Sequence, residues 1–251
     1  MASPTYKSAL IVGAGRGLSA SLARLFASEG LRVALAARDA EKLAPLCGET
    51  GAKAFACDAV EPDQVARLFS AVEAATGAPD VVVYNASARA RGPVAELVPA
   101  EVGRAIMVSA FGGFLVAREA AARMMPKGHG AILFTGASAS VKGYPLSAPF
   151  AMGKFALRGL AQSMAREMAP HGIRVNAICP GIVVDTAMRT AIEAQQRRYG
   201  LPETAERERS VPIGRVSVPD DVAGIAAFLA SDESSYMTGE SINLSGGLLM
   251  D

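Results

Sequence analysis

Cysteine and histidine are scarce in this chain. Only three of its 251 residues are cysteine and two are histidine. Cys47, Cys57 and Cys179 are odd in number and far apart, which argues against a disulfide framework and fits reduced thiols that pack as small apolar side chains. With only His129 and His171, and no Cys-x-x-Cys pair, the sequence offers no ligand set for a transition metal. We therefore expect no metal site.

The chain also lacks an excess of charge and a long apolar run. Lysine and arginine number 25 against 24 acidic residues, so the net charge of +1 gives no reason to expect nucleic acid or an anionic membrane as a partner. The apolar run after Lys7 is interrupted at 13–17 by glycines and Arg16, and no stretch approaches the length that spans a bilayer. We expect a globular, cytoplasmic protein without a targeting segment.

Three glycines within five residues stand out near the amino end. Gly13, Gly15 and Gly17 lie between an apolar strand pattern and a helix pattern that begins near Leu18. A tight turn without side chains, followed by a helix, presents backbone N–H groups and the positive end of the helix dipole, which together bind a phosphate. The last glycine of the fingerprint G-x-G-x-x-G is replaced by Ser19, and a glycine cluster alone is equally typical of an ordinary turn.

Short apolar segments alternate with helical patterns along the chain. In the helical pattern Pro62–Thr76, for example, Val65, Leu68, Phe69 and Val72 share one face. The predicted strands are Ser8–Val12, Arg32–Ala36, Ala52–Ala56, Val81–Tyr84, Ala131–Phe134, Arg174–Ile178 and Ser241–Leu244. Strands joined by crossover helices predict a doubly wound α/β fold, with a seven-stranded parallel sheet between two helical layers and the ligand at the strands' carboxyl ends.

No repeat or linker divides residues 1–251, so we expect a single domain. Residues 185–218 are polar and carry no strand pattern, and in such a fold a long excursion after a late strand covers the ligand crevice. We interpret this segment as a substrate lid; a pair of solvated surface helices is the alternative.

Several landmarks recur at the spacing of one family. They are the glycine turn, Asp58, Tyr84-Asn85-Ala86-Ser87, Lys154, Cys179-Pro180-Gly181 and the closing segment Thr238–Gly247. From end to end the chain resembles the short-chain dehydrogenases/reductases. The resemblance implies a Rossmann fold and an oxidoreductase that transfers a hydride between a nicotinamide cofactor and a carbonyl or alcohol.

The residues after the second strand bear on the choice of cofactor. In the family a carboxylate there binds the ribose 2′-hydroxyl of NAD, whereas a cation meets the 2′-phosphate of NADP. This chain has Ala37 and then Arg38, and Arg16 in the glycine turn can reach the same group. We therefore predict NADP(H); the alternative is that both arginines are ordinary surface charges.

The resemblance also implies the remaining cofactor contacts. Asp58, followed by Ala59, is placed to read the adenine amino group. The stretch Asn85–Ser87 is placed against the adenosine ribose, and the turn Pro180–Ile182 beside the nicotinamide carboxamide. Thr186 is assigned only loosely, because it falls one residue later than the family pattern.

The catalytic positions depart from the family. A tyrosine four residues before the lysine normally donates the proton, and the lysine lowers its pKa and holds the ribose. Lys154 is present, but Phe150 occupies the tyrosine position and Ser109 the asparagine position. Ala137 falls where a serine is expected, with Ser138 adjoining. The alternative tyrosine position of enoyl reductases, seven residues before the lysine, also lacks a phenol, because it is Ser147.

Three explanations stay open for this site. Another group could donate the proton, with Tyr144 as the nearby phenol and Ser138 or a water held by Lys154 as lesser options. The substrate could need no strong acid, since general acid catalysis contributes about 10²–10⁴-fold. The chain could instead bind NADP(H) without turnover, as a sensor or an inactive subunit. A protein that has abandoned the cofactor would have little use for Arg16, Arg38 and Lys154.

The resemblance further implies a homodimer or homotetramer. The helix pattern Phe150–Met168 contains Phe155, Leu157, Leu160 and Met164, more apolar side chains than one sheet-facing side needs. The predicted lid has apolar and basic residues, which suit a hydrophobic or an anionic substrate equally well. They are Ala187, Met188, Ile192, Ile213, Arg189, Arg197 and Arg198.

Overall fold

A computed structural model describes residues 6–184, 189–200 and 204–249. Within these ranges, seven strands form one parallel sheet in the order β3-β2-β1-β4-β5-β6-β7. The strands are β1 Ser8–Val12, β2 Arg32–Ala37, β3 Lys53–Ala56, β4 Val81–Tyr84, β5 Gly130–Thr135, β6 Ile173–Pro180 and β7 Ser241–Leu244. The predicted doubly wound sheet is confirmed: β1, β4 and β7 have the predicted bounds, and the other four strands differ from prediction by one or two residues at an end.

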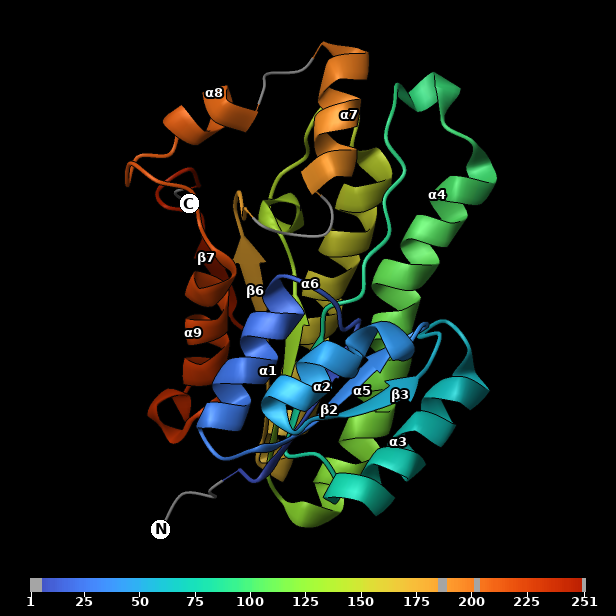
Figure 1. The fold of residues 1–251 in the computed structure, drawn as a ribbon, viewed down its shortest axis with the longest axis vertical. Helices are drawn as coiled ribbons and strands as arrows, with labels where there is room; N and C mark the ends of the chain where they lie inside the picture. Colours follow the sequence, from blue (N-terminus) through green and yellow to red (C-terminus); the bar gives the residue numbers. More distant parts are fainter. Residues whose placement is uncertain (1–5, 185–188, 201–203, 250–251) are drawn as a thin grey trace.

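Helices cover both faces of the sheet (Figure 1). One face packs against α1 Leu18–Ser28, α2 Ala44–Thr50 and α9 Pro219–Ala230, and the other against α3 Pro62–Thr76, α5 Gly112–Met124 and α6 Ala148–Met168. Central strands are buried on both sides, as the uninterrupted apolar sequence of β4 reflects. The sheet therefore separates two apolar cores, and its carboxyl edge stays available for a ligand.

Helix α4 Pro99–Ile106 continues through a π-helical turn, Met107–Phe111, into α5. The continuous helix Pro99–Lys127 has 29 residues and a window of mean hydropathy 1.4, enough to cross a membrane by length and composition. The expectation that no stretch reaches that length was therefore wrong. The apolar character has a packing reason, because Val116, Ala120 and Met124 lie fully buried against the sheet.

The segment interpreted as a lid contains α7 Arg189–Tyr199 and α8 Thr204–Arg209. Both lie at the end of the molecule opposite the amino terminus (Figure 1). The described part of this segment adds no strand to the sheet, although Val183 and Ser217 form an isolated bridge. Thr186, Ala187 and Met188 lie outside the described residues.

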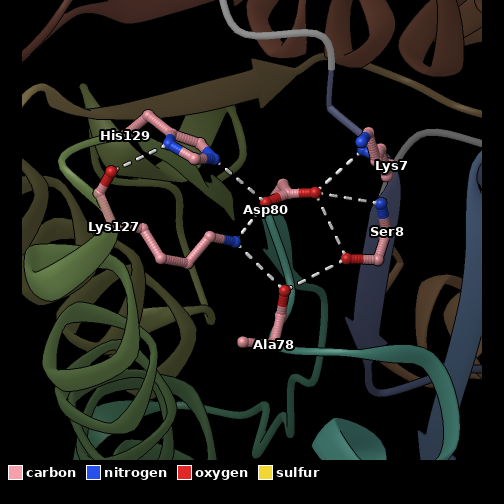
Figure 2. A network of polar contacts seen from close by, with 6 residues as sticks. All are labelled: Lys7, Ser8, Ala78, Asp80, Lys127 and His129. Atoms are coloured by element: carbon pink, nitrogen blue, oxygen red, sulfur yellow. Dashed lines mark hydrogen bonds and ion pairs between the residues drawn. The ribbon is translucent and has the colours of Figure 1, made fainter.

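A polar network joins the amino ends of three strands, at the edge of the sheet opposite the strands' carboxyl ends (Figure 2). Asp80, just before β4, is 6% exposed and accepts hydrogen bonds from the Lys7 and Ser8 amides at 2.8 and 3.2 Å. Lys127 pairs with the same carboxylate, and His129 Nε2 lies 3.3 Å from it. One buried charge thus holds together the starts of β1, β4 and β5.

Candidate functional site

A cleft of about 1340 Å³ opens at the carboxyl ends of the strands. It is lined by most of the predicted site residues: Gly13, Gly15, Arg16, Leu18, Arg38, Asp58, Ala59, Asn85, Ala86, Ser87, Ser138, Tyr144, Phe150, Lys154, Pro180, Gly181 and Ile182. Two predicted members, Gly17 and Ser109, are not among the lining residues. The cleft therefore unites positions that the sequence spreads over about 170 residues.

Gly13 lies where the glycine turn comes closest to the loop after β4. Its φ of 87° lies in the region that favours glycine, and an added Cβ would lie 2.6 Å from the Cα of Ala86. Gly15 has open space where a side chain would be, so its backbone faces the cleft directly. Gly17, with φ of 82°, starts α1 instead and its carbonyl accepts the first helical amides, so its contribution is conformational.

Ser19 compensates for the missing glycine. Its hydroxyl donates to the Gly13 carbonyl at 3.1 Å and accepts a hydrogen bond from Asn85 Nδ2 at 2.7 Å. The serine therefore ties the glycine turn to the loop after β4, and sequence reasoning, which counted it only as a departure, missed this function. The available signal in the sequence was a polar residue at a glycine position.

Replacing Ser19 by glycine is expected to destabilise the protein by about 2–3 kcal/mol. The change removes two hydrogen bonds and adds a flexible residue to α1, each worth roughly 1 kcal/mol. Ser70→Gly in α3 is the control, because this exposed serine bonds only the Ala66 carbonyl within its own helix. Urea unfolding of both variants measures the difference, and equal losses would show that the Asn85 contact contributes nothing.

The outer part of the cleft presents donors suited to phosphate groups. Arg16 and Arg38 are exposed and line it, while the neighbouring carboxylate of Asp39 pairs with Lys42 at 2.8 Å. The Ser87 hydroxyl is buried in the cleft wall without a hydrogen-bond partner among the described residues. The open glycine turn, this hydroxyl and two guanidinium groups fit an extended dinucleotide. The described residues contain no cluster of three or more metal-ligating side chains.

Lys154 lies at the inner end of the cleft. It projects from α6, is 2% exposed, and its Nζ donates to the Thr135 carbonyl at 2.6 Å. Burial, and then the nearby positive charge of Arg89, lower the pKa of Lys154 to about 7. The amine can therefore gain or release a proton near neutral pH, which is the property that general acid–base chemistry needs.

Phe150 presents an apolar ring to the cleft and is 8% exposed. The guanidinium carbon of Arg89 lies 3.8 Å from the centroid of this ring, and Lys154 Nζ lies 5.7 Å from the same centroid. Two cations thus flank the position that carries a hydroxyl in the family pattern. Arg89 was not predicted, because its loop matches no motif; the alternating arginines at 89 and 91 were the only signal.

The other catalytic positions divide between the cleft and the core. Ser109 is fully buried in the π-helical turn, and an added Cβ on Gly153 of α6 would lie 2.6 Å from its Cβ. Ser109, which occupies the asparagine position of the family pattern, therefore lies in the packing between this turn and α6 and does not line the cleft. The same turn is held by Tyr84, a residue predicted only as a landmark, whose hydroxyl donates to the Val108 carbonyl.

Both Ala137 and Ser138 line the cleft, as does Tyr144. The Ala137 amide donates to the Ser140 hydroxyl at 3.1 Å, which fixes the loop in an extended conformation at 137. Ser138 directly follows the position where the family pattern expects a serine, and it lines the cleft. Lys142 Nζ lies 5.3 Å from the Tyr144 ring centroid.

Residues 13–249 match the family model described as enoyl-(acyl carrier protein) reductase. A short-chain dehydrogenase/reductase of Armillaria gallica is 34% identical over 255 residues, covering 97% of this chain and 96% of the relative.

Two solved structures have similar folds over nearly their whole length. Actinorhodin polyketide ketoreductase with NADPH superposes with a TM-score of 0.91, at 29% identity over 99% of each chain. Xylitol dehydrogenase with bound NAD+ has a TM-score of 0.88 and 29% identity, over 96% of this chain and 98% of the other. The family model and the Armillaria gallica relative each span nearly all of the chain, which therefore belongs to the short-chain dehydrogenase/reductase family of oxidoreductases.

Proposed function

We propose that this protein is an NADP(H)-dependent oxidoreductase that interconverts a carbonyl and an alcohol with an atypical proton donor. The observation that carries the proposal is a single cleft that runs from the glycine turn and Arg38 to Lys154. A lysine with a pKa of about 7, buried at the end of a dinucleotide-shaped cleft, is a group poised for proton transfer.

The choice of NADP(H) is supported by Arg16 and Arg38. No carboxylate occupies the Ala37 position at the end of β2, and Asp39 is already paired with Lys42. Guanidinium groups match the geometry of a phosphate, whereas an uncharged ribose hydroxyl would gain little from two cations. The two similar structures hold different nicotinamide cofactors, so the preference follows from these residues rather than from the fold.

The bound nicotinamide would supply the hydride, and the chain must supply the proton. Lys154 is the proposed source of this proton. In the direction of reduction, its ammonium gives a proton to the carbonyl oxygen as that oxygen becomes an alcohol, and the amine then recovers a proton from solvent. Phe150 has no proton to give. Its ring instead excludes water and forms an apolar wall of the cleft. Tyr144 and Ser138 are the alternative donors, since their hydroxyls belong to residues that line the same cleft.

Residues 185–218 are proposed as a substrate lid within one domain that spans 1–251. Gln196 of α7 lines the cleft, and the Tyr199 hydroxyl donates to the Arg91 carbonyl at 3.4 Å. Helix α7 therefore contacts the loop after β4 across the cleft mouth. Movement of this helix would admit and enclose a small carbonyl or alcohol substrate.

We further propose a homodimer or homotetramer in the cytoplasm. Of the predicted apolar set on α6, Leu157 and Met168 are buried in the core, whereas Phe155 is exposed. With Met152 it forms an apolar strip on α6, and Phe114 is likewise exposed on α5. A second copy of the chain would cover such side chains. A reducing compartment is consistent with the absence of disulfides among the three cysteines.

The first experiment measures NADPH oxidation over a panel of ketones, aldehydes and quinones. The native chain is expected to reduce at least one of them, with a rate that falls as pH rises through about 7, because the ammonium form of Lys154 is lost. Lys154→Met is expected to lower kcat by about 100-fold. Exposed Lys53 provides the matched control, Lys53→Met.

At three positions the hydrogen-bonding side chain of the family pattern is replaced by another residue. This replacement supports a second candidate function, a protein that binds the cofactor without turnover. Ser109, Ala137 and Phe150 together remove the side chains that the family pattern uses for acid catalysis. The variant Phe150→Tyr separates the two functions. Activity in the native chain that changes less than about tenfold in this variant supports the atypical donor, whereas activity in the variant alone supports the binding protein.

A further inference from the structure

The π-helical turn Met107–Phe111 forms part of the cleft wall. Its first two residues, Met107 and Val108, line the same cleft as Phe150 and Lys154. A π-helical turn inside an α-helix is rare and occurs frequently at functional sites. The contacts that hold this turn therefore bear on the shape of the cleft.

Tyr84, the last residue of β4, supports this turn from the sheet. Its side chain is 1% exposed, and its hydroxyl donates a hydrogen bond to the Val108 carbonyl. Burial raises the pKa of the phenol well above its usual value, so the hydroxyl remains a neutral donor at neutral pH. A Cβ added to Gly112, directly after the turn, would collide with this hydroxyl. The hydroxyl therefore occupies a space that a glycine at 112 leaves open.

The same turn packs directly against α6, the helix that carries Lys154. A Cβ added to Gly153 would lie 2.6 Å from the Cβ of Ser109 in the turn. A Cβ added to Gly113, just after the turn, would lie 2.5 Å from Leu157 Cδ2 of α6. Because both positions are glycine, no side chain at either of them cushions the contact, and a displacement of the turn is passed to the backbone of α6 next to Lys154.

The protonation of Lys154 depends on how closely its surroundings are packed. Burial is the largest cause of its lowered pKa. Two ionisable groups of other elements also act on it: Arg89, in the loop after β4, lowers the pKa, and Cys179 of β6 raises it. The turn Met107–Phe111 carries no ionisable side chain. It can therefore act on the lysine only through packing and the exclusion of water.

We propose that Tyr84 is a positioning residue for Lys154: its hydroxyl fixes the π-helical turn, and the turn keeps α6 in the position that holds the lysine buried beside the reacting carbonyl. This inference rests on the proposed function, because Lys154 is the proton donor proposed there. Tyr84 is not among the residues that line the cleft. Loss of its hydroxyl should therefore change protonation and rate without removing a contact to the cofactor.

The variant that tests the proposal is Tyr84→Phe, which removes only the hydroxyl. Water that enters beside a loosened turn stabilises the ammonium form, so the titration midpoint of Lys154 is expected to rise by about 0.5 pH units or more. NMR of protein containing lysine enriched in carbon-13 at Cε measures this midpoint without turnover, and the Lys154 signal is the one missing from Lys154→Met. In the oxidation assay, kcat should fall about tenfold while the KM for NADPH changes by less than about twofold.

Two further variants make the result specific. Tyr6→Phe removes a hydroxyl that hydrogen-bonds Arg174 near the amino ends of the strands. It should lower the melting temperature by about 2–4 °C, as Tyr84→Phe does, but leave the Lys154 midpoint unchanged. Gly112→Ala displaces the Tyr84 hydroxyl by collision, so it should raise the midpoint as well. In the double variant with Tyr84→Phe, the rise should be smaller than the sum of the two single effects.

Two results would overturn the inference: a Lys154 midpoint in folded Tyr84→Phe that equals that of the native chain, or an equal rise in Tyr6→Phe. If Tyr84→Phe does not fold, an unchanged midpoint in Gly112→Ala overturns it instead. Failure of the proposed function is recognised separately, as absence of NADPH oxidation by the native chain, and it leaves the NMR comparison of the variants intact.

Discussion

The double variant Arg16→Ala/Arg38→Ala is expected to bind NADPH about 100-fold more weakly than the native chain, with NADH binding changed by less than about threefold. Each guanidinium is placed to make a charge-assisted contact with the 2′-phosphate, worth about tenfold in affinity at this exposed position. NADH lacks that phosphate, so removal of the arginines should not directly lower the affinity for NADH. Cofactor fluorescence titrations measure both constants and require no substrate.

The control for this prediction is Arg67→Ala, which removes an exposed arginine outside the cleft. Its NADPH affinity should match that of the native chain. The single variant Arg38→Ala should account for at least half of the loss in free energy, because Arg38 directly follows β2. If both cofactors weaken equally in the double variant, the arginines act on the shared part of the dinucleotide and the NADP(H) assignment is wrong.

Asp80→Asn is expected to lower the free energy of unfolding by about 3 kcal/mol. The carboxylate is almost fully buried and accepts hydrogen bonds from Lys7, Ser8 and Lys127 (Figure 2). Removing its charge leaves Lys127 without its ion pair at the starts of three strands. The corresponding fall in melting temperature is about 10 °C for a chain of this size.

The same residue contributes a pH dependence of stability. Burial alone would raise the pKa of Asp80, but the hydrogen bonds from Lys127 and the Lys7 amide outweigh it and hold the pKa below its usual value. The contribution is therefore present at pH values above the unfolded pKa and is lost as pH falls through the folded pKa. The free energy of unfolding of Asp80→Asn should therefore change less between neutral and acid pH than that of the native chain.

Asp63→Asn provides the matched control, since it neutralises an exposed carboxylate in the first turn of α3. It should cost less than about 1 kcal/mol. If Asp80→Asn were as mild as this control, the network would be a consequence of the strand packing and not one of its causes.

The positions of Arg89 and Lys154 beside Phe150 offer a physical reason for a phenylalanine in place of the family's tyrosine. A phenol at 150 beside two cations would ionise more readily, whereas a phenyl ring stacks on the guanidinium and stays neutral. The variant Phe150→Tyr thus tests the proton donor and also disturbs the support of Arg89.

The sheet could be predicted from sequence because its information is local. Seven short apolar segments separated by helical patterns specify strands and crossovers, and the rule for parallel connections then fixes the layers. Likewise, Gly13 could be recognised from the sequence, because only glycine permits its positive φ and its close approach to Ala86. Site residues tied to strand ends or to the glycine turn were accordingly brought into one cleft, as expected.

Residues whose surroundings depend on distant segments could not be predicted in this way. Ser19 meets Asn85, and Arg89 meets Phe150, only after strands and helices far apart in sequence have packed. The position of Ser109 likewise depends on packing between helices, because it lies against Gly153 of α6. The sequence alone determined the fold, the position of the cofactor turn and the loss of the tyrosine. Only the tertiary structure decided which charges surround Lys154, because desolvation and Coulomb interactions depend on distances that no local pattern encodes.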